Sequence, residues 1–132
     1  MAWRLYDYLN QRGDNEVADW TRGLQKSDRA RLNQKLDMLE RYGIDGLPPK
    51  LVAGPLGGHR HIYKLRIDGS VAMRPMLCKG PIDMNREFTL LLGATERDRV
   101  LDPMDAPRRA EQRRTEIIAN PTRRCNHERV AK

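Results

Sequence analysis

The sequence predicts an α+β fold: a small, twisted, antiparallel-rich sheet with an N-terminal two-helix hairpin on one face and a C-terminal helix. Two apolar stretches flank Asp68-Gly69, and this dipeptide is the strongest short-range signal for a β-hairpin. Apolar residues recur at helical spacing between residues 15 and 43, and a further helix start follows residue 104. The 132 residues suffice for one domain, so a single sheet with packed helices is expected.

The N-terminal part alternates as a strand over residues 3–9 and then turns at Gly13. Asp14 or Asn15 can cap a first helix. Its apolar positions are Val17, Trp20 and Leu24. Ser27 is the expected cap of a second helix, which ends at Gly43. The stripe of the second helix is Leu32, Leu36 and Leu39, and both stripes are interpreted as core packing.

The central hairpin spans residues 59–79, and its side chains should alternate between two faces. The odd positions are mostly apolar and should face the core: Tyr63, Leu65, Ile67, Val71, Met73 and Leu77. The even positions hold cations and should form the other face: Arg60, Lys64, Arg66 and Arg74. Pro75 marks an edge or a bulge, because it cannot donate a ladder hydrogen bond. His59 and His61 fall on the core-side register, which favours packing over acid–base chemistry.

Residues 88–92 are almost continuously apolar, as expected of a central strand. A charged exit follows at residues 96–99. Asp105 with Pro107 begins a helix that runs to Ala119, with a thin apolar stripe. Residues 120–132 are polar and basic and are expected to form a flexible tail outside the domain, which covers residues 1–119.

The formal net charge of +7 is unevenly distributed. Residues 54–80 hold five Lys or Arg against one Asp, and residues 106–132 hold eight against three Glu. Clustered positive charge indicates a phosphate-bearing partner, chiefly nucleic acid. For the C-terminal segment, a solubilising surface is an equally good interpretation.

Other classes of protein fit less well. No run of about 18 apolar residues or signal-peptide core is present, so a cytoplasmic protein without membrane contact is expected. Two cysteines do not make a disulfide framework. Cys125-Asn126-His127 is too sparse for a zinc site, so neither a metal nor another cofactor is expected.

The order of elements resembles the RelE/HigB-like superfamily of bacterial type II toxins, including its phage-derived branch. The matching features run from Trp20 and Leu24 through Tyr63-Lys64-Leu65-Arg66 and Arg74 to the strand before Gly93. They cover about residues 3–119. The resemblance implies an endoribonuclease that cleaves mRNA, on or off the ribosome, and that an antitoxin neutralises. It also implies a monomer or a toxin–antitoxin hetero-oligomer.

RNA cleavage of this kind uses the 2′-hydroxyl as nucleophile, so it needs proton transfer and cations that stabilise charge at phosphorus. Arg66 and Arg74 are the expected transition-state stabilisers, because the guanidinium fork matches phosphate oxygens. Lys64 could bind phosphate or act as a base if neighbouring cations lower its pKa. The expected RNA-binding residues are Arg60, Lys79, Arg97 and Arg99.

Two alternatives remain. Lys64 stands where many relatives carry Glu, so a non-catalytic RelE-fold protein could bind nucleic acid or a host protein through its basic face. The two-helix hairpin could instead serve an interaction module. At the level of single residues, some of the cations could simply pair with Asp68, Glu96 or Asp98.

Overall fold

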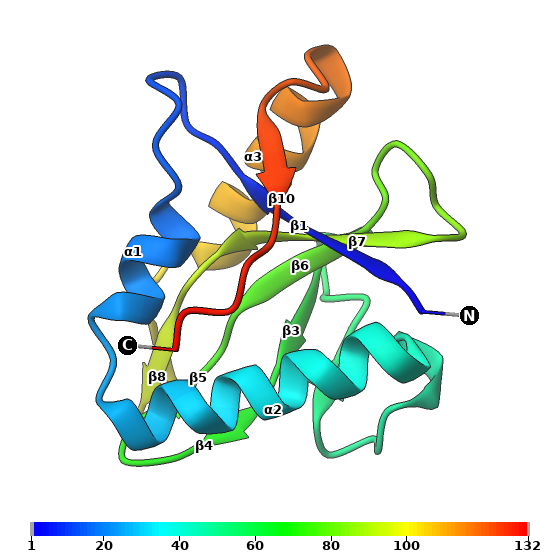
Figure 1. Ribbon diagram of the computed structural model, residues 1–132. Coiled ribbons are helices and arrows are strands. Elements are labelled where there is room, and N and C mark those ends of the chain that lie inside the picture. Colours follow the sequence, from blue (N-terminus) through cyan, green and yellow to red (C-terminus); the bar gives the residue numbers. More distant parts are fainter. Residues whose placement is uncertain (1, 132) are drawn as a thin grey trace.

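The computed structural model describes residues 2–131 and has an α+β architecture (Figure 1). Its α-helices within that range are α1 (Glu16–Arg22), α2 (Lys26–Tyr42) and α3 (Ala106–Ala119), with a 3₁₀ turn η1 (Ile44–Gly46) after α2. None of the helices in residues 2–131 is both long and apolar enough to cross a membrane.

The main sheet has six strands in the order β10-β1-β7-β6-β3-β2. These strands are β10 (Arg124–Asn126), β1 (Arg4–Tyr8), β7 (Glu87–Leu92), β6 (Met76–Lys79), β3 (Tyr63–Leu65) and β2 (Val52–Ala53). Strands β1 and β7 run parallel, and the other neighbours in this sheet are antiparallel. The predicted antiparallel-rich sheet is therefore confirmed.

A smaller sheet continues from the main one in the order β4-β5-β8-β9. Its strands are β4 (Ile67–Asp68), β5 (Ala72–Met73), β8 (Thr95–Arg97) and β9 (Val100–Asp102). The predicted hairpin around Asp68-Gly69 is present, because Ile67 pairs with Met73 and Tyr63 pairs with Leu77. Each side of this hairpin is interrupted where the two sheets meet, so β3 and β6 belong to the main sheet, whereas β4 and β5 belong to the smaller one. A register shift directly after Met76 confirms the irregularity expected at Pro75.

Both faces of the main sheet are covered, because two apolar clusters lie on its opposite sides. The first cluster joins α2 to the sheet and contains Leu32, Leu36, Leu39, Leu65, Leu77, Phe88 and Leu90. The second joins α3 to the sheet and contains Ile62, Met76, Cys78, Leu91, Ala106, Ala110 and Ile117. The expectation of one open basic face is thus wrong for most of this sheet.

The predicted helix boundaries are largely confirmed. The Asn15 side chain accepts a hydrogen bond from the Ala18 amide and caps α1. Gly43 ends α2 with a φ of 71°, a conformation that glycine adopts without strain. The start of α2 differs from the prediction, because the helix begins at Lys26 instead of after a Ser27 cap. Helix α3 has the predicted bounds.

Three local expectations are wrong. Residues 59–62 form turns before β3, so His59 and His61 are half-buried instead of core-facing. Val71 is exposed at the hairpin tip. The segment after Asn120 is part of the fold, because β10 pairs with β1 and extends the sheet edge.

Beyond β10, the chain continues between α1 and α2 (Figure 1). There Arg129 pairs with Asp37 of α2 at 2.9 Å, and the Asn33 side chain donates to the Val130 carbonyl. Basic side chains at this end of the chain therefore serve the fold.

Adjacent isoleucines on α3 test the packing of this helix on the sheet. Ile117 is fully buried, whereas 49% of Ile118 is exposed. We expect Ile117→Ala to lower the free energy of unfolding by about 2–5 kcal/mol. Ile118→Ala should change it by less than about 0.5 kcal/mol, as is usual at the surface. Urea denaturation of both variants provides the measurement, and equal effects would contradict the packing of α3.

Candidate functional site

The predicted catalytic cations Lys64 and Arg74 meet at one carboxylate. The Lys64 ammonium lies 3.7 Å from Oε1 of Glu96, and Nε of Arg74 lies 3.5 Å from the same oxygen. Glu96 comes from β8, Lys64 from β3, and Arg74 from the link between β5 and β6. Three segments that are distant in sequence thus place two cations around one acid at the junction of the two sheets.

A second carboxylate contacts Arg74 from the solvent side. Both terminal nitrogens of Arg74 lie 3.2 Å from Oδ1 of Asp68, and Nη1 also donates to the Met73 carbonyl. The exposed fraction is 81% for the Asp68 side chain but 10% for that of Arg74. The cations of the even positions are therefore not free of acidic partners, because Asp68 of the same hairpin contacts Arg74.

Three of the other predicted residues, Arg66, Arg60 and Lys79, lie in three separate places. Arg66 lies between Lys64 and Asp68 in the sequence, is exposed, and has no ion-pair partner among the described residues. Arg60 lies in the turns before β3 and donates from Nε to Nε2 of His61 at 3.3 Å. Lys79 lies 5.8 Å from the centroid of the Tyr63 ring, which packs toward α2, so Lys79 faces away from Lys64.

Arg97 and Arg99 belong to the β-hairpin of β8 and β9, whereas the sequence predicts only a charged segment after the central strand. Arg97 pairs with Val100 across a two-residue turn, in which Asp98 and Arg99 have φ values of 52° and 66°. Because side chains alternate along β8, Arg97 points to the face opposite that of Glu96. Arg99 is exposed at the turn, so neither arginine joins Lys64 and Arg74.

Helix α2 anchors the tip of the hairpin that carries Asp68. The Asp28 carboxylate accepts hydrogen bonds from the backbone amide of Ser70, at 2.8 Å, and from its hydroxyl. These two hydrogen bonds hold the pKa of Asp28 below its ordinary value of 3.8. A Cβ added to Gly69 would collide with the same carboxylate, so the glycine permits this close approach.

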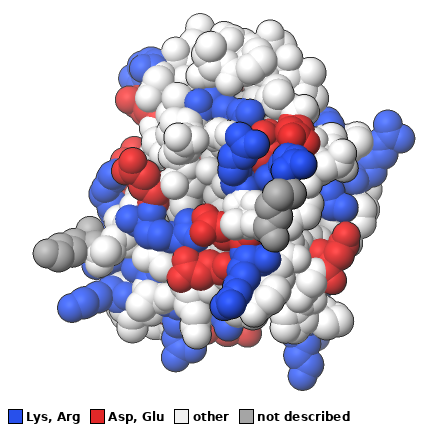
Figure 2. Space-filling view, turned by 45° about the vertical axis from the view of Figure 1, so that its right-hand side comes forward, with Lys and Arg blue, Asp and Glu red and all other residues white. Residues whose placement is uncertain are grey.

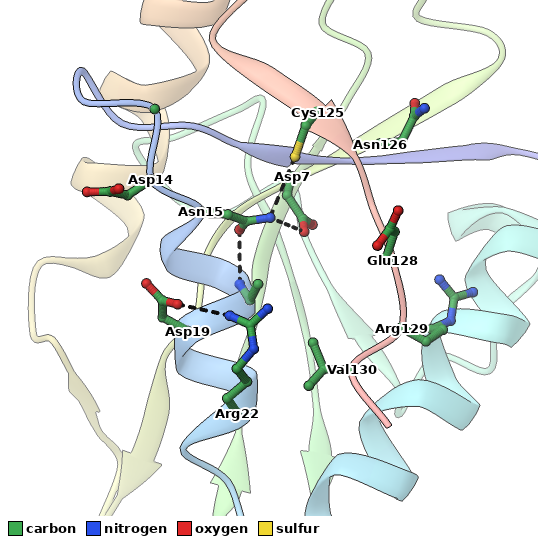
Figure 3. Close-up of a pocket in the computed structure, with 12 residues that line it drawn as sticks. Asp7, Asp14, Asn15, Asp19, Arg22, Cys125, Asn126, Glu128, Arg129 and Val130 are labelled. Carbon is green, nitrogen blue, oxygen red and sulfur yellow. Dashed lines mark hydrogen bonds and ion pairs between the residues drawn. The ribbon is translucent and has the colours of Figure 1, made fainter. Parts of the chain in front are cut away.

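A cavity lies elsewhere, between β1, α1 and residues 125–130, and has a volume of about 840 Å³ (Figure 3). On its floor the Asn15 side chain donates to Asp7, at 2.9 Å, and contacts the Cys125 sulfur at 3.6 Å. Asp7 also lies 2.8 Å from Nδ1 of His127. Burial and the Asp7 carboxylate raise the pKa of Cys125, which disfavours its thiolate. We interpret these buried contacts as the attachment of the C-terminal segment.

Charges on the surface are mixed. Figure 2 shows one face of the molecule, on which acidic side chains lie among the Lys and Arg side chains without a single continuous basic patch. The net charge of +7 is therefore a weak guide to the position of a site on this face. Ion-paired groups such as Lys64, Arg74 and Glu96 indicate the position of a site better than the net charge does. Among residues 2–131, no cluster of three or more His, Cys, Asp or Glu residues could hold a metal ion.

The alternative that some of the cations pair with Asp68 or Glu96 is confirmed, because Lys64 and Arg74 contact Glu96 and Arg74 also contacts Asp68. The sequence predicts no further part for Glu96, whose only signal is its place in the charged segment 96–99 that follows the buried strand β7. Comparisons with protein-family models, curated proteins and solved structures find no match to this chain. The assignment of the site therefore depends on its own geometry.

The Asp28–Ser70 contact predicts an acid-sensitive contribution to stability. Because the pKa of Asp28 is lowered in the folded state, this contribution is present above pH 3.8 and is lost as the pH falls through the folded-state pKa. Ser70→Ala removes the hydroxyl donor, so we expect the melting temperature to fall less steeply between pH 6 and pH 3 than in the wild type. Thermal melts at several pH values measure this slope, and parallel curves would contradict the prediction.

Proposed function

We propose that this protein binds RNA at the junction of its two sheets and cleaves it there, as a toxin of a toxin–antitoxin pair. The observation that carries the proposal is the position of the Glu96 carboxylate between Lys64 and Arg74. A carboxylate beside two cations combines a proton acceptor with charges that stabilise a phosphorane. Arg66 is exposed and follows Lys64 by two residues, so it offers a further contact for the RNA backbone.

The proposed reaction is a transesterification within the RNA. Glu96 accepts the proton of the 2′-hydroxyl, whose oxygen attacks the adjacent phosphorus. Arg74 and Arg66 stabilise the negative charge on the phosphoryl oxygens. The bond from phosphorus to the 5′-oxygen breaks, and Lys64 donates a proton to that leaving oxygen. The products are a 2′,3′-cyclic phosphate and a 5′-hydroxyl end.

Glu96 also bears on the resemblance to the RelE/HigB-like superfamily. Many members of that family have Glu at the position of Lys64. In this chain, β8 brings a carboxylate beside Lys64 from another strand. A proton acceptor is thus available although β3 itself has no carboxylate, which favours catalysis over the non-catalytic alternative.

Substitution of Glu96 tests the chemistry separately from binding. Glu96→Gln keeps the size of the side chain and removes the base, so we expect the cleavage rate to fall by about 10²–10⁴-fold. Affinity for a non-cleavable RNA should be retained or increase, because a negative charge is lost. Glu128→Gln, at the cavity near α1, is the matched control and should cleave normally.

The assay uses purified protein with a short RNA, with the same RNA carrying a 2′-deoxy sugar at the cleavage position, and with translating ribosomes. Induced expression with mapping of new 5′ ends provides the cellular counterpart. Full cleavage by Glu96→Gln would exclude Glu96 as the base. Tight, salt-dependent RNA binding by the wild type without cleavage in any of these assays would establish the non-catalytic alternative.

Arg74 tests the need for a guanidinium. Arg74→Lys retains the positive charge but cannot make the two-pronged contact with phosphate. We expect cleavage to fall at least about tenfold, with a smaller change in RNA affinity. Circular dichroism and a thermal melt check the fold, since Arg74 is largely buried. Unchanged cleavage in a folded Arg74→Lys protein would remove Arg74 from the proposed centre.

A further inference from the structure

The turns before β3 are attached to helix α3. Nδ1 of His59 lies 2.6 Å from a carboxylate oxygen of Glu111, and Ile62 is fully buried in the cluster beneath α3. This attachment places the intervening residues Arg60 and His61 next to the helix. They therefore lie on the side of the main sheet that α3 covers.

Two unpaired cations and an imidazole are close together at this point. The Arg60 side chain donates to Nε2 of His61, which is therefore unprotonated at that nitrogen. Burial, followed by the charges of Arg114 and Arg60, holds the pKa of His61 below its ordinary value of 6.5, although the Glu111 carboxylate acts in the opposite direction. Glu111 contacts His59, and Arg114 follows Glu111 by about one helical turn, so Arg114 lies on the same face of α3 as the turns that carry His61. Within residues 2–131, neither Arg60 nor Arg114 forms an ion pair with a carboxylate, and Glu111, the nearby acid, pairs with His59.

One donor in this group has no acceptor. Nε of Arg114 is buried and makes no hydrogen bond among the described residues. A buried guanidinium nitrogen without an acceptor is costly, and most such groups find a partner. A phosphate oxygen is a suitable acceptor, because it brings negative charge and several lone pairs to the arginine fork.

We propose that Arg60, His61 and Arg114 form a second anion site, which binds a phosphate of the RNA chain next to the one at Glu96. This inference rests on the proposed function. His61 precedes Lys64 by three positions, so their Cα atoms are at most about 10 Å apart. Met76, the partner of Lys64 across the strands, belongs to the α3 cluster, so both sites lie on the α3 side.

Binding of short 2′-O-methyl oligoribonucleotides, which cannot be cleaved, tests the second site. For single strands, each lost phosphate contact should reduce the slope of log K against log salt by about 0.7. We expect Arg114→Gln and Arg60→Gln each to show this reduction and to bind a hexanucleotide at least about threefold more weakly. Arg41→Gln at the end of α2 removes the same charge on the other side of the sheet and should retain the wild-type slope.

The outcomes separate the two proposals. If Arg66→Gln weakens binding while Arg60→Gln and Arg114→Gln match Arg41→Gln, the second anion site is wrong and the proposed function stands. If the wild type binds no oligonucleotide, the proposed function fails and the second site fails with it. Arg60 is exposed, so its variant gives an answer even if Arg114→Gln does not fold.

Discussion

Strands β3, β6 and β7 are neighbours in the main sheet, and the chain next to each of them continues into the smaller sheet. Backbone hydrogen bonds between these three crossing points hold them side by side. The Leu65 amide donates to the Pro75 carbonyl at 3.0 Å, and the Arg74 amide donates to Ala94 at 2.8 Å. These bonds hold β3, β6 and β7 together where they pass into β4, β5 and β8. Lys64, Arg74 and Glu96 lie at or beside these bends. The geometry of the proposed centre is therefore fixed by the backbone and depends little on flexible loops.

Burial of both faces of the main sheet explains why the charges gather at this junction. Apolar side chains of α2 and α3 cover the two faces, and a charged group beneath them would lose its hydration. The junction is only partly covered, and the exposed fractions are 20% for the Lys64 side chain and 23% for Glu96. At such intermediate burial, charges interact more strongly than in water and can still reach a ligand.

Periodicity predicted the local structure well, and it failed where distant segments meet. The stripe of α2, the bounds of α3 and the hairpin at Asp68-Gly69 each depend on neighbouring residues, and the sequence indicated all three. The pairing of β10 with β1 and the covering of the sheet by α3 depend on contacts between segments that are not neighbours in the sequence. Likewise, the alternation of side chains along the hairpin predicts that Lys64 and Arg74 share a face. The position of Glu96 beside them depends on the pairing of β8 with β5, which alternation does not reveal.

The two acids around Arg74 differ in a way that bears on phosphate binding. Glu96 is mostly covered and contacts both cations, so its removal from the centre would leave Lys64 without a carboxylate partner and Arg74 with Asp68 alone. Asp68 is 81% exposed, and ion pairs at such positions contribute little to stability. An incoming phosphate can therefore replace Asp68 at the Arg74 fork at low cost while Glu96 stays in place. The hairpin that supplies this exchangeable carboxylate is held by Asp28, which connects its position to helix α2.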